Sequence, residues 1–335
     1  MQKNMIEVSH LVKKYGKHLA VNDLSFTMEK GMIYGFLGAN GAGKSTTMNI
    51  MTGYLAATEG EVRIEGIDIL KEPEKAKKSI GYLPEQPPVY PDMTVEEYLM
   101  FAAELKKIPK KEQRTEVYRV MEKTATGEVA GRLIQNLSKG YRQRVGLAQA
   151  ILGDPPIIIL DEPTVGLDPK QILEIRELIL SLKEEHIILL SSHILSEVAA
   201  VCDKILILSK GRLAASDSTA NLVDRLEKKD GSGGRLELWL LGKAMKAKEV
   251  VGSMEEVSVL ECVDKGQGEC RLLLEWNKHG DVRERLFYLL AEHRLPIMKL
   301  TTESRSLEEV FLELTEGEEE TMKEAKEGKE NEGDL

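Results

Sequence analysis

Residues 38–45 read Gly-Ala-Asn-Gly-Ala-Gly-Lys-Ser, which fits the pattern G-x-x-x-x-G-K-[ST]. The motif follows an apolar run over residues 32–37 and precedes a helical pattern from Thr46 to Leu55. Glycines let the backbone wrap around a phosphate with its N–H groups turned inward, and the N-terminus of the following helix attracts negative charge. A glycine-rich turn with an exposed lysine is the simpler alternative, but it leaves both flanks unexplained. We therefore expect Lys44 to reach the β- and γ-phosphates of a nucleotide and the Ser45 hydroxyl to bind Mg²⁺.

A pair of carboxylates follows a second apolar run. Residues 157–160 read Ile-Ile-Ile-Leu, and Asp161-Glu162-Pro163 come directly after them. We expect Asp161 to hold Mg²⁺ and its waters, and Glu162 to act as the general base toward an attacking water. An Asp-Glu pair after a strand is usually a plain turn, so this prediction depends on the phosphate loop.

Short apolar runs alternate with helical patterns through the first two hundred residues, which indicates a parallel sheet flanked by helices. Parallel strands buried on both faces are continuously apolar and rich in isoleucine, as residues 157–160, 187–190 and 205–208 are. An antiparallel β layer is expected at the N-terminus, from Val8, Leu11, Val21, Leu24 and Phe26. The sequence therefore predicts an α/β fold of the P-loop NTPase class.

The composition changes near Asp230-Gly231-Ser232-Gly233-Gly234, which is typical of a flexible linker. We expect a nucleotide-binding domain over residues 1–225, a linker over 226–234 and a second domain over 235–315. The second domain shows the order β-α-β-β-α-β of a small α+β, ferredoxin-like unit, with a last helix over 306–314. Residues 316–335 carry nine acidic and three basic side chains and few apolar ones, which predicts a disordered acidic tail.

Charge and composition exclude several functions for the 335-residue chain. Its 46 basic and 56 acidic side chains give a net charge of −10, without a dominant basic stripe, so we expect no nucleic-acid binding as the main activity. No run approaches the roughly 18 apolar residues that cross a bilayer. The three cysteines have no metal-like spacing, which suits a reducing compartment.

Further motifs follow the phosphate loop in a fixed order. Residues 82–86 read Tyr-Leu-Pro-Glu-Gln, residues 137–141 read Leu-Ser-Lys-Gly-Tyr, and the carboxylate strand comes next. Residues 166–168 then read Gly-Leu-Asp, and residues 191–193 read Ser-Ser-His. This order resembles the ATP-binding cassette (ABC) family over roughly residues 5–215, with its glutamine loop, signature loop, D-loop and switch histidine. The resemblance implies an ABC ATPase fold with a helical subdomain over about residues 88–155.

The signature loop departs from the common form of the family, which is Leu-Ser-Gly-Gly-Gln. Lys139 replaces the first glycine and Tyr141 replaces the glutamine. Ser138 and Gly140, the positions that contact phosphate in the family, are kept. The departures therefore remove no catalytic group.

The resemblance gives roles to side chains that match the family's motifs. Tyr15 would stack on adenine, although an exposed loop tyrosine is the alternative. Gln86 would contact Mg²⁺ or the attacking water, and His193 would bond to the γ-phosphate and position Glu162. Catalysis would thus involve Lys44, Gln86, Glu162 and His193, and Mg²⁺ would be held by Ser45, Gln86 and Asp161. The implied ATP contacts are Tyr15, Gly38, Asn40, Gly41, Gly43, Lys44, Ser45, Thr46, Ser138 and Gly140.

In this family the signature loop contacts the nucleotide that is bound by the opposite subunit. The loop lies at a helix N-terminus, which is a favourable neighbour for phosphate oxygens. One chain holds one set of motifs, so the resemblance implies a second ABC ATPase subunit, as a homodimer or a heterodimer. It also implies a separate transmembrane permease, through which this chain would be held at the cytoplasmic side of the plasma membrane. Residues 306–312 and the Leu-Ser-Lys-Gly signature are similar to prokaryotic exporter ATPases with a C-terminal extension.

Two other functions are compatible with a cassette sequence. A soluble ABC-type ATPase acting on ribosomes or DNA usually has two cassettes in a chain or a long coiled coil, and neither pattern is present. A regulatory cassette without activity is expected to lose Lys44, Glu162 or His193, and all three are present.

Overall fold

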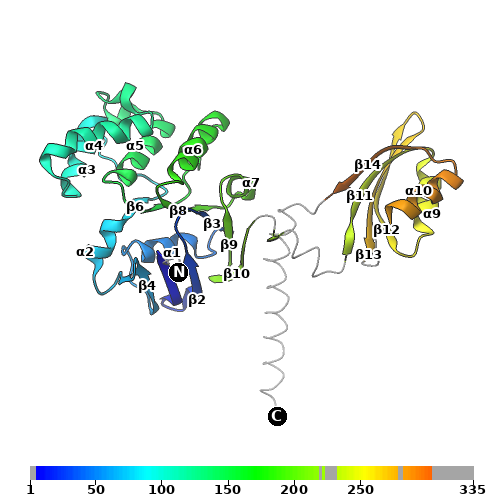
Figure 1. Cartoon of the computed structure of the whole chain (residues 1–335), viewed down its shortest axis with the longest axis horizontal. Helices are drawn as coiled ribbons and strands as arrows, with labels where there is room; N and C mark the ends of the chain where they lie inside the picture. Colours follow the sequence, from blue (N-terminus) through cyan, green and yellow to red (C-terminus); the bar gives the residue numbers. More distant parts are fainter. Residues whose placement is uncertain (1–4, 219–220, 223–231, 278–281, 304–335) are drawn as a thin grey trace, which may run out of the picture. The chain divides into compact units, whose positions relative to one another are not determined.

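The computed structural model describes residues 5–218, 221–222, 232–277 and 282–303. Contacts within the chain divide it into two compact units, and the division lies between Ser218 and Thr219 (Figure 1). Residues 226–231 of the expected linker (226–234), the expected helix at 306–314 and the expected tail at 316–335 lie outside the described residues. Each unit is described by itself.

The first unit begins with an antiparallel β layer, as the alternating apolar positions predict. Its strands are β1 (Ile6–Tyr15), β2 (His18–Met28), β4 (Glu59–Ile64) and β5 (Ile67–Asp68), in the order β2-β1-β4-β5. The five apolar positions expected to carry this layer are all buried, namely Val8, Leu11, Val21, Leu24 and Phe26.

The second layer is a six-stranded sheet in the order β10-β9-β3-β8-β7-β6. It comprises β3 (Ile33–Leu37), β6 (Ile80–Leu83), β7 (Ile157–Leu160), β8 (Ile187–Ser192), β9 (Lys204–Ser209) and β10 (Arg212–Asp217). Every pairing is parallel except that of β10 with β9. The isoleucine-rich runs are buried within this sheet, which confirms the predicted α/β fold.

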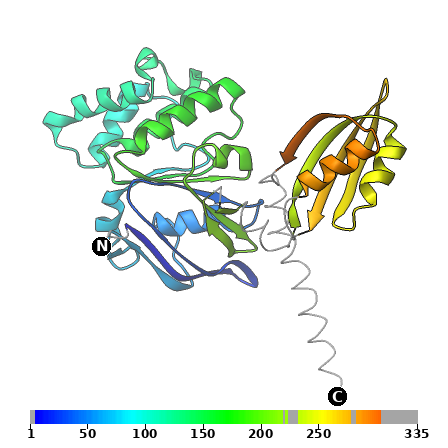
Figure 2. The ribbon, with the colours of Figure 1, turned by 45° about the vertical axis from the view of Figure 1, so that its right-hand side comes forward.

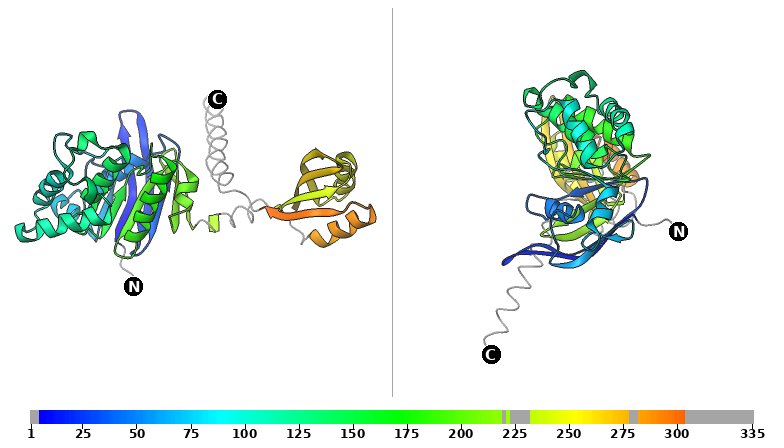
Figure 3. Two further views of the ribbon diagram at one scale, coloured as in Figure 1. Left: turned by 90° about the horizontal axis from the view of Figure 1, so that it is seen from above. Right: turned by 90° about the vertical axis from the view of Figure 1, so that its left-hand side faces the viewer.

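Helices cover this sheet and form a separate lobe. The unit contains α1 (Lys44–Met51), α2 (Pro73–Ala76), α3 (Val95–Leu105), α4 (Lys110–Lys123), α5 (Lys139–Ile151), α6 (Pro169–Leu182) and α7 (Leu195–Ala199). Short 3₁₀ turns cover Lys77–Ser79, Gly127–Val129 and Ile134–Asn136. Figure 2 shows α3, α4 and α5 gathered together, and the right panel of Figure 3 shows these helices at the opposite end of the unit from the blue N-terminal strands.

Helix α1 lies between the two β layers and ends earlier than the sequence pattern predicts. Met48, Ile50 and Met51 belong to one apolar cluster with residues of both sheets. The predicted helix reached Leu55, but α1 ends at Met51, and Gly53 then takes a φ of 65° that a continuing helix does not allow. The phosphate loop is therefore held at a short, buried helix.

The second unit has the expected order of strands and helices. It contains β11 (Ser232–Leu241), α9 (Ala244–Gly252), β12 (Val257–Gly266), β13 (Glu269–Asn277), α10 (Arg283–Glu292) and β14 (Ile297–Glu303). The antiparallel order β12-β13-β11-β14 is that of a ferredoxin-like unit. Leu236, Leu238 and Leu240 lie on one face of β11 and form a core with residues of both helices. Strand β11 begins at Ser232, inside the stretch 226–234 that was expected to be a linker.

The helices of the described ranges are too short or too polar to cross a membrane.

Candidate active site

The phosphate loop connects the buried strand β3 to the first residue of α1. Gly43 has a φ of 100°, and a Cβ atom placed on it would lie 2.7 Å from the carbonyl oxygen of Ala20. A Cβ atom on Gly38 would lie 2.6 Å from the carbonyl oxygen of Leu208. Both positions therefore need glycine, the first for its conformation and the second for space. No side chain caps the N-terminus of α1, so its first amides remain suited to an anionic ligand.

Lys44 lies inside the loop rather than in solvent. Its side chain is 6% exposed, and its Nζ atom donates to the carbonyl oxygen of Gly38 at 2.6 Å. The same Nζ atom lies 3.6 Å from Oε1 of Glu162. A buried cation at the centre of a glycine-rich loop is suited to bind phosphate oxygens.

Asp161 follows β7 and is held by two hydroxyl groups. Ser45 Oγ donates to Asp161 Oδ1 at 3.2 Å, and Ser191 Oγ donates to the same oxygen at 2.6 Å. The carboxylate is buried, and its backbone N–H donates to the carbonyl oxygen of Leu83. A hydroxyl and a carboxylate at this spacing form a hard oxygen donor set, so these residues fit Mg²⁺.

Glu162 is fixed by its backbone and by both carboxylate oxygens. Its φ of 48° is in the left-handed region, and its backbone N–H donates to Ser191 Oγ at 2.9 Å. Oε2 lies 3.0 Å from His193 Nδ1, and Oε1 faces Lys44. A strained conformation held in this way is typical of functional positions. The carboxylate is thus held between the buried Lys44 ammonium and the imidazole of His193.

These groups surround one cleft of about 390 Å³. It contains most of the side chains that the sequence assigned to ATP. Tyr15 lies at the cleft with half of its side chain exposed, and Lys13 Nζ is 5.2 Å from the centre of its ring. The predicted residues that line the cleft are Tyr15, Asn40, Gly41, Gly43, Lys44, Ser45, Thr46, Glu162 and His193. The structure therefore brings together residues that are up to 178 positions apart, Tyr15 and His193 being the extremes.

Comparison with known proteins identifies the family. The family described as "ABC transporter" matches residues 21–165. The linearmycin resistance ATP-binding protein LnrL of Bacillus subtilis (strain 168) is 30% identical over 315 residues, which cover 93% of this chain and 98% of LnrL. The bacitracin transport ATP-binding protein BcrA of Bacillus licheniformis is 33% identical, with the same coverage of 93% and 98%. This chain belongs to the ABC transporter ATP-binding proteins.

The fold of the first unit is that of an ABC ATPase cassette. The ATP-binding cassette MJ0796, solved as a dimer in a post-hydrolysis state bound to ADP and Pi, matches with a TM-score of 0.59 at 26% identity. The match covers 64% of this chain and 98% of MJ0796. The ABC ATPase family binds ATP, typically with Mg²⁺, and hydrolyses it.

Five predicted site residues of this ABC protein lie outside the lining of the cleft. Gly38 and Asp161 are buried directly behind it, where they contact Lys44 and Ser45. Gln86 is exposed and does not line the cleft, whereas its neighbour Glu85 does. Ser138 is exposed at the start of α5, where its Oγ accepts from the backbone N–H of Tyr141.

Gly140 completes this group at the N-terminus of α5. A Cβ atom placed on it would lie 2.7 Å from Cδ of Gln171, so glycine is needed for packing. Gly140 lines a second cleft, between α5 and α6, and is not among the residues around the phosphate loop. Within one chain, the structure does not bring the signature residues to the nucleotide cleft.

Two residues of the cleft region were missed by sequence reasoning. Ser191 Oγ donates to Asp161 Oδ1 and accepts from the backbone N–H of Glu162, which ties the Asp161 carboxylate to the backbone of the next residue. His18 lines the cleft from β2. Ser191 precedes the switch histidine by two residues, but this motif does not indicate its contacts, which follow from the pairing of β8 with β7. His18 carries no comparable signal, because it lies in an ordinary strand pattern.

Proposed function

We propose that this ABC protein is the ATP-hydrolysing subunit of a multi-chain exporter, which dimerises around two ATP molecules and drives a separate transmembrane permease. It would act at the cytoplasmic side of the plasma membrane, where the permease holds it. The observation that carries the proposal is the contact of Glu162 with both Lys44 and His193 at the end of the Asp161 strand.

The geometry supports hydrolysis of a phosphate chain bound in the cleft. Lys44 and the α1 amides would neutralise the phosphate oxygens, and Ser45 and Asp161 would hold Mg²⁺, which supplies Lewis-acid polarisation when bound. Glu162 would accept a proton from the attacking water, while His193 keeps the carboxylate turned toward the cleft. Because Glu162 is buried, few bulk water molecules can reach its carboxylate and compete with the attacking water for it.

The position of the signature residues supports a dimer. Ser138 and Gly140 lie apart from the cleft of their own chain, at a helix N-terminus that attracts anions. A second cassette arranged head to tail would place its Ser138 and Gly140 over the nucleotide bound by Lys44. MJ0796 has been solved as a dimer with ADP and Pi, which supports this arrangement for the similar cassette here.

The relatives support export. LnrL is named for linearmycin resistance and BcrA for bacitracin transport, and both match over nearly the whole chain. Their coverage of 93% extends beyond the first unit, so the similarity includes the region of the second unit. We infer that the chain drives removal of a substrate from the cell.

The proposal is tested by purifying the full chain from its native membranes. We expect a polytopic membrane protein to co-purify, and ATP hydrolysis by that complex to disappear with Lys44→Ala. Lys111→Ala is the matched control, because Lys111 is exposed on α4 and lies outside the cleft. Co-purification of ribosomes or DNA without a membrane protein would support the soluble ATPase instead.

A further inference from the structure

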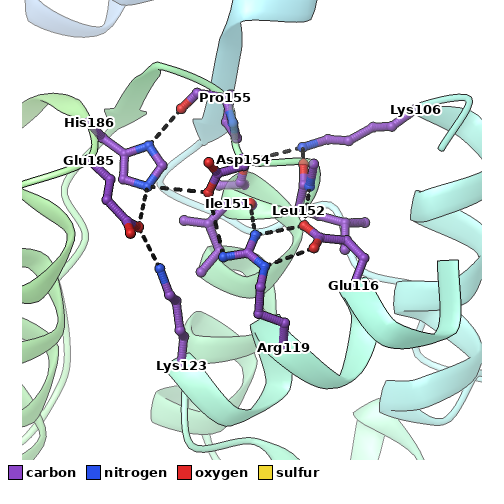
Figure 4. Close-up of polar contacts among 12 residues, drawn as sticks. Lys106, Glu116, Arg119, Lys123, Ile151, Leu152, Asp154, Pro155, Glu185 and His186 are labelled. Carbon is purple, nitrogen blue, oxygen red and sulfur yellow. Dashed lines mark hydrogen bonds and ion pairs between the residues drawn. The ribbon is translucent and has the colours of Figure 1, made fainter. Parts of the chain in front are cut away.

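A second cluster of titratable side chains lies at the opposite edge of the central sheet from the nucleotide cleft. Asp154 lies between α5 and β7, and Glu185 and His186 lie between α6 and β8. Because β7 and β8 are parallel neighbours, the segments that enter them meet at the same edge. Figure 4 shows the three side chains converging there.

His186 is the buried centre of this cluster. Its side chain is 1% exposed, and its Nδ1 atom lies 2.7 Å from the carbonyl oxygen of Pro155. A carbonyl oxygen only accepts, so Nδ1 carries a proton and donates it to this bond. In the neutral ring, Nε2 then presents a lone pair.

The Nε2 atom of His186 has no hydrogen-bond partner among the described residues. It faces Asp154 Oδ1 and Glu185 Oε2, each at 3.8 Å, which is too far for a hydrogen bond. A buried polar atom without a partner lowers the stability of the folded state. His186 Nε2 is therefore expected to have a partner located between these two oxygens.

We propose that His186, Asp154 and Glu185 bind a divalent transition-metal ion of the zinc class. Imidazole nitrogens and carboxylate oxygens are both ligands that zinc takes in proteins. The bond from His186 Nδ1 to the carbonyl oxygen of Pro155 fixes the ring, as second-shell carbonyls do for metal-bound histidines. A solvent molecule would complete four-coordination.

The distances suit such an ion after small movements. Metal–ligand bonds of about 2.0–2.2 Å in a tetrahedron place neighbouring ligand atoms about 3.3–3.6 Å apart. The three ligand atoms here lie within 4.8 Å of one another. The side chains of Asp154 and Glu185 are 60% and 57% exposed, so they can close on the ion and solvent can reach it.

The carboxylates of the cluster already have basic neighbours. Lys123 Nζ lies 2.7 Å from Glu185 Oε2, and Arg119 Nη1 lies 3.5 Å from Asp154 Oδ1. Arg119 is mainly engaged by Glu116, to which it donates two hydrogen bonds. The bonds from Arg119 lower the pKa of Glu116, and Lys106 also acts electrostatically on Glu116 and lowers that pKa. Three basic side chains therefore face the three carboxylates of Glu116, Asp154 and Glu185. Each ligating carboxylate has a second oxygen that can keep its basic neighbour.

The loop that holds Asp154 is positioned before any ion binds. The backbone N–H of Gly153 donates to Glu116 Oε1 at 2.7 Å, and that of Asp154 donates to the carbonyl oxygen of Ile151 at 3.1 Å. Asp154 has a φ of 53°, which aspartate tolerates better than most residues. A bound ion would therefore tie the end of α5 to the start of β8.

The proposal is tested by calorimetric titration of the nucleotide-free full chain with Zn²⁺ alone. Changes in the second shell of a metal site cost about 10–100-fold in affinity, so loss of a ligand should cost at least about 100-fold. We expect one zinc-binding site to lose at least about 100-fold in affinity in His186→Gln and in Asp154→Asn. Asparagine is chosen at position 154 because it tolerates the same backbone conformation. His293→Gln is the matched control, because His293 is exposed and distant in sequence. Zinc that binds to thiols or in the nucleotide cleft should bind equally to the wild type and to all three variants, so it does not affect the comparison.

A second readout reports on the ring itself. Zn²⁺ should shift the ¹⁵N resonance of His186 Nε2 in the wild-type chain. If the ring instead carries two protons and pairs with the carboxylates, added Zn²⁺ leaves this resonance unchanged, and the proposal is wrong. Equal zinc binding by the wild type and Asp154→Asn would overturn it as well, even if His186→Gln fails to fold.

Discussion

Substitution of Glu162 by glutamine tests whether this carboxylate is the base that activates water. The amide has the same size, so the backbone bond from residue 162 to Ser191 Oγ should survive. Glutamine cannot accept a proton at neutral pH, and it lacks the charge that faces Lys44 at 3.6 Å and His193 at 3.0 Å. The change therefore removes the chemistry and preserves the shape of the cleft.

The expected effect is large because the side chain of Glu162 is only 10% exposed. A general base contributes about 10²–10⁴ in rate. That range corresponds to about 2.7–5.5 kcal/mol in the activation free energy. We expect the upper half of this range, since bulk water has little access to replace the missing base.

The assay measures phosphate release by the purified complex and elution of the full chain at saturating ATP. Glu162→Gln should retain ATP and elute as a dimer, because the γ-phosphate that holds the two copies together is not removed. Glu177→Gln on the exposed face of α6 is the control and should match the wild type. Turnover within threefold of the wild type would refute the role as base. A variant that binds ATP but stays monomeric would refute the dimer.

Three other predictions concern the loop, a helix cap and a buried amine. Gly43→Ala should abolish ATP binding in equilibrium dialysis, because the new Cβ lies 2.7 Å from the carbonyl oxygen of Ala20 at a φ of 100°; normal binding would contradict this. Thr94→Ala should cost about 1 kcal/mol in urea unfolding, since Thr94 and Glu97 form a reciprocal cap at the start of α3; an unchanged midpoint would contradict it. Burial lowers the pKa of Lys106 from 10.5 to about 8, so the unfolded state binds more protons between these values. The free energy of unfolding should therefore rise as the pH increases from about 8 to 10.5, and Lys106→Met should remove that rise in unfolding curves at several pH values.

The parts of the fold that follow from local patterns could be predicted from the sequence. The central strands are continuous apolar runs, and such runs are typical of parallel strands that are buried on both faces of a covered sheet. The start of α3 is likewise written in the sequence, because Thr94 and Glu97 form a reciprocal cap directly at its N-terminus. The end of α1 was misplaced, since a single glycine at position 53 decides it and glycine alone is a weak signal.

The residues of the candidate site could be predicted from the sequence only where they belong to a recognisable motif. Lys44, Asp161 and Glu162 stand in recognisable patterns, and the structure places them within contact of one another or of shared neighbours. Ser191 could not be assigned, because its importance comes from the register of β8 beside β7. The proximity of Asp154 to His186 could not be predicted from the sequence either, because 32 residues separate them and neither belongs to a motif.

The separation of Ser138 from Lys44 in one chain has a genetic consequence for a paired assembly. Each composite site would draw its lysine from one copy and its serine from the other. Two differently damaged chains, one lacking the lysine and the other the serine, would still assemble one complete site. Both lesions placed in a single chain would spoil every site that this chain enters, so complementation would depend on how the defects are distributed rather than on their number.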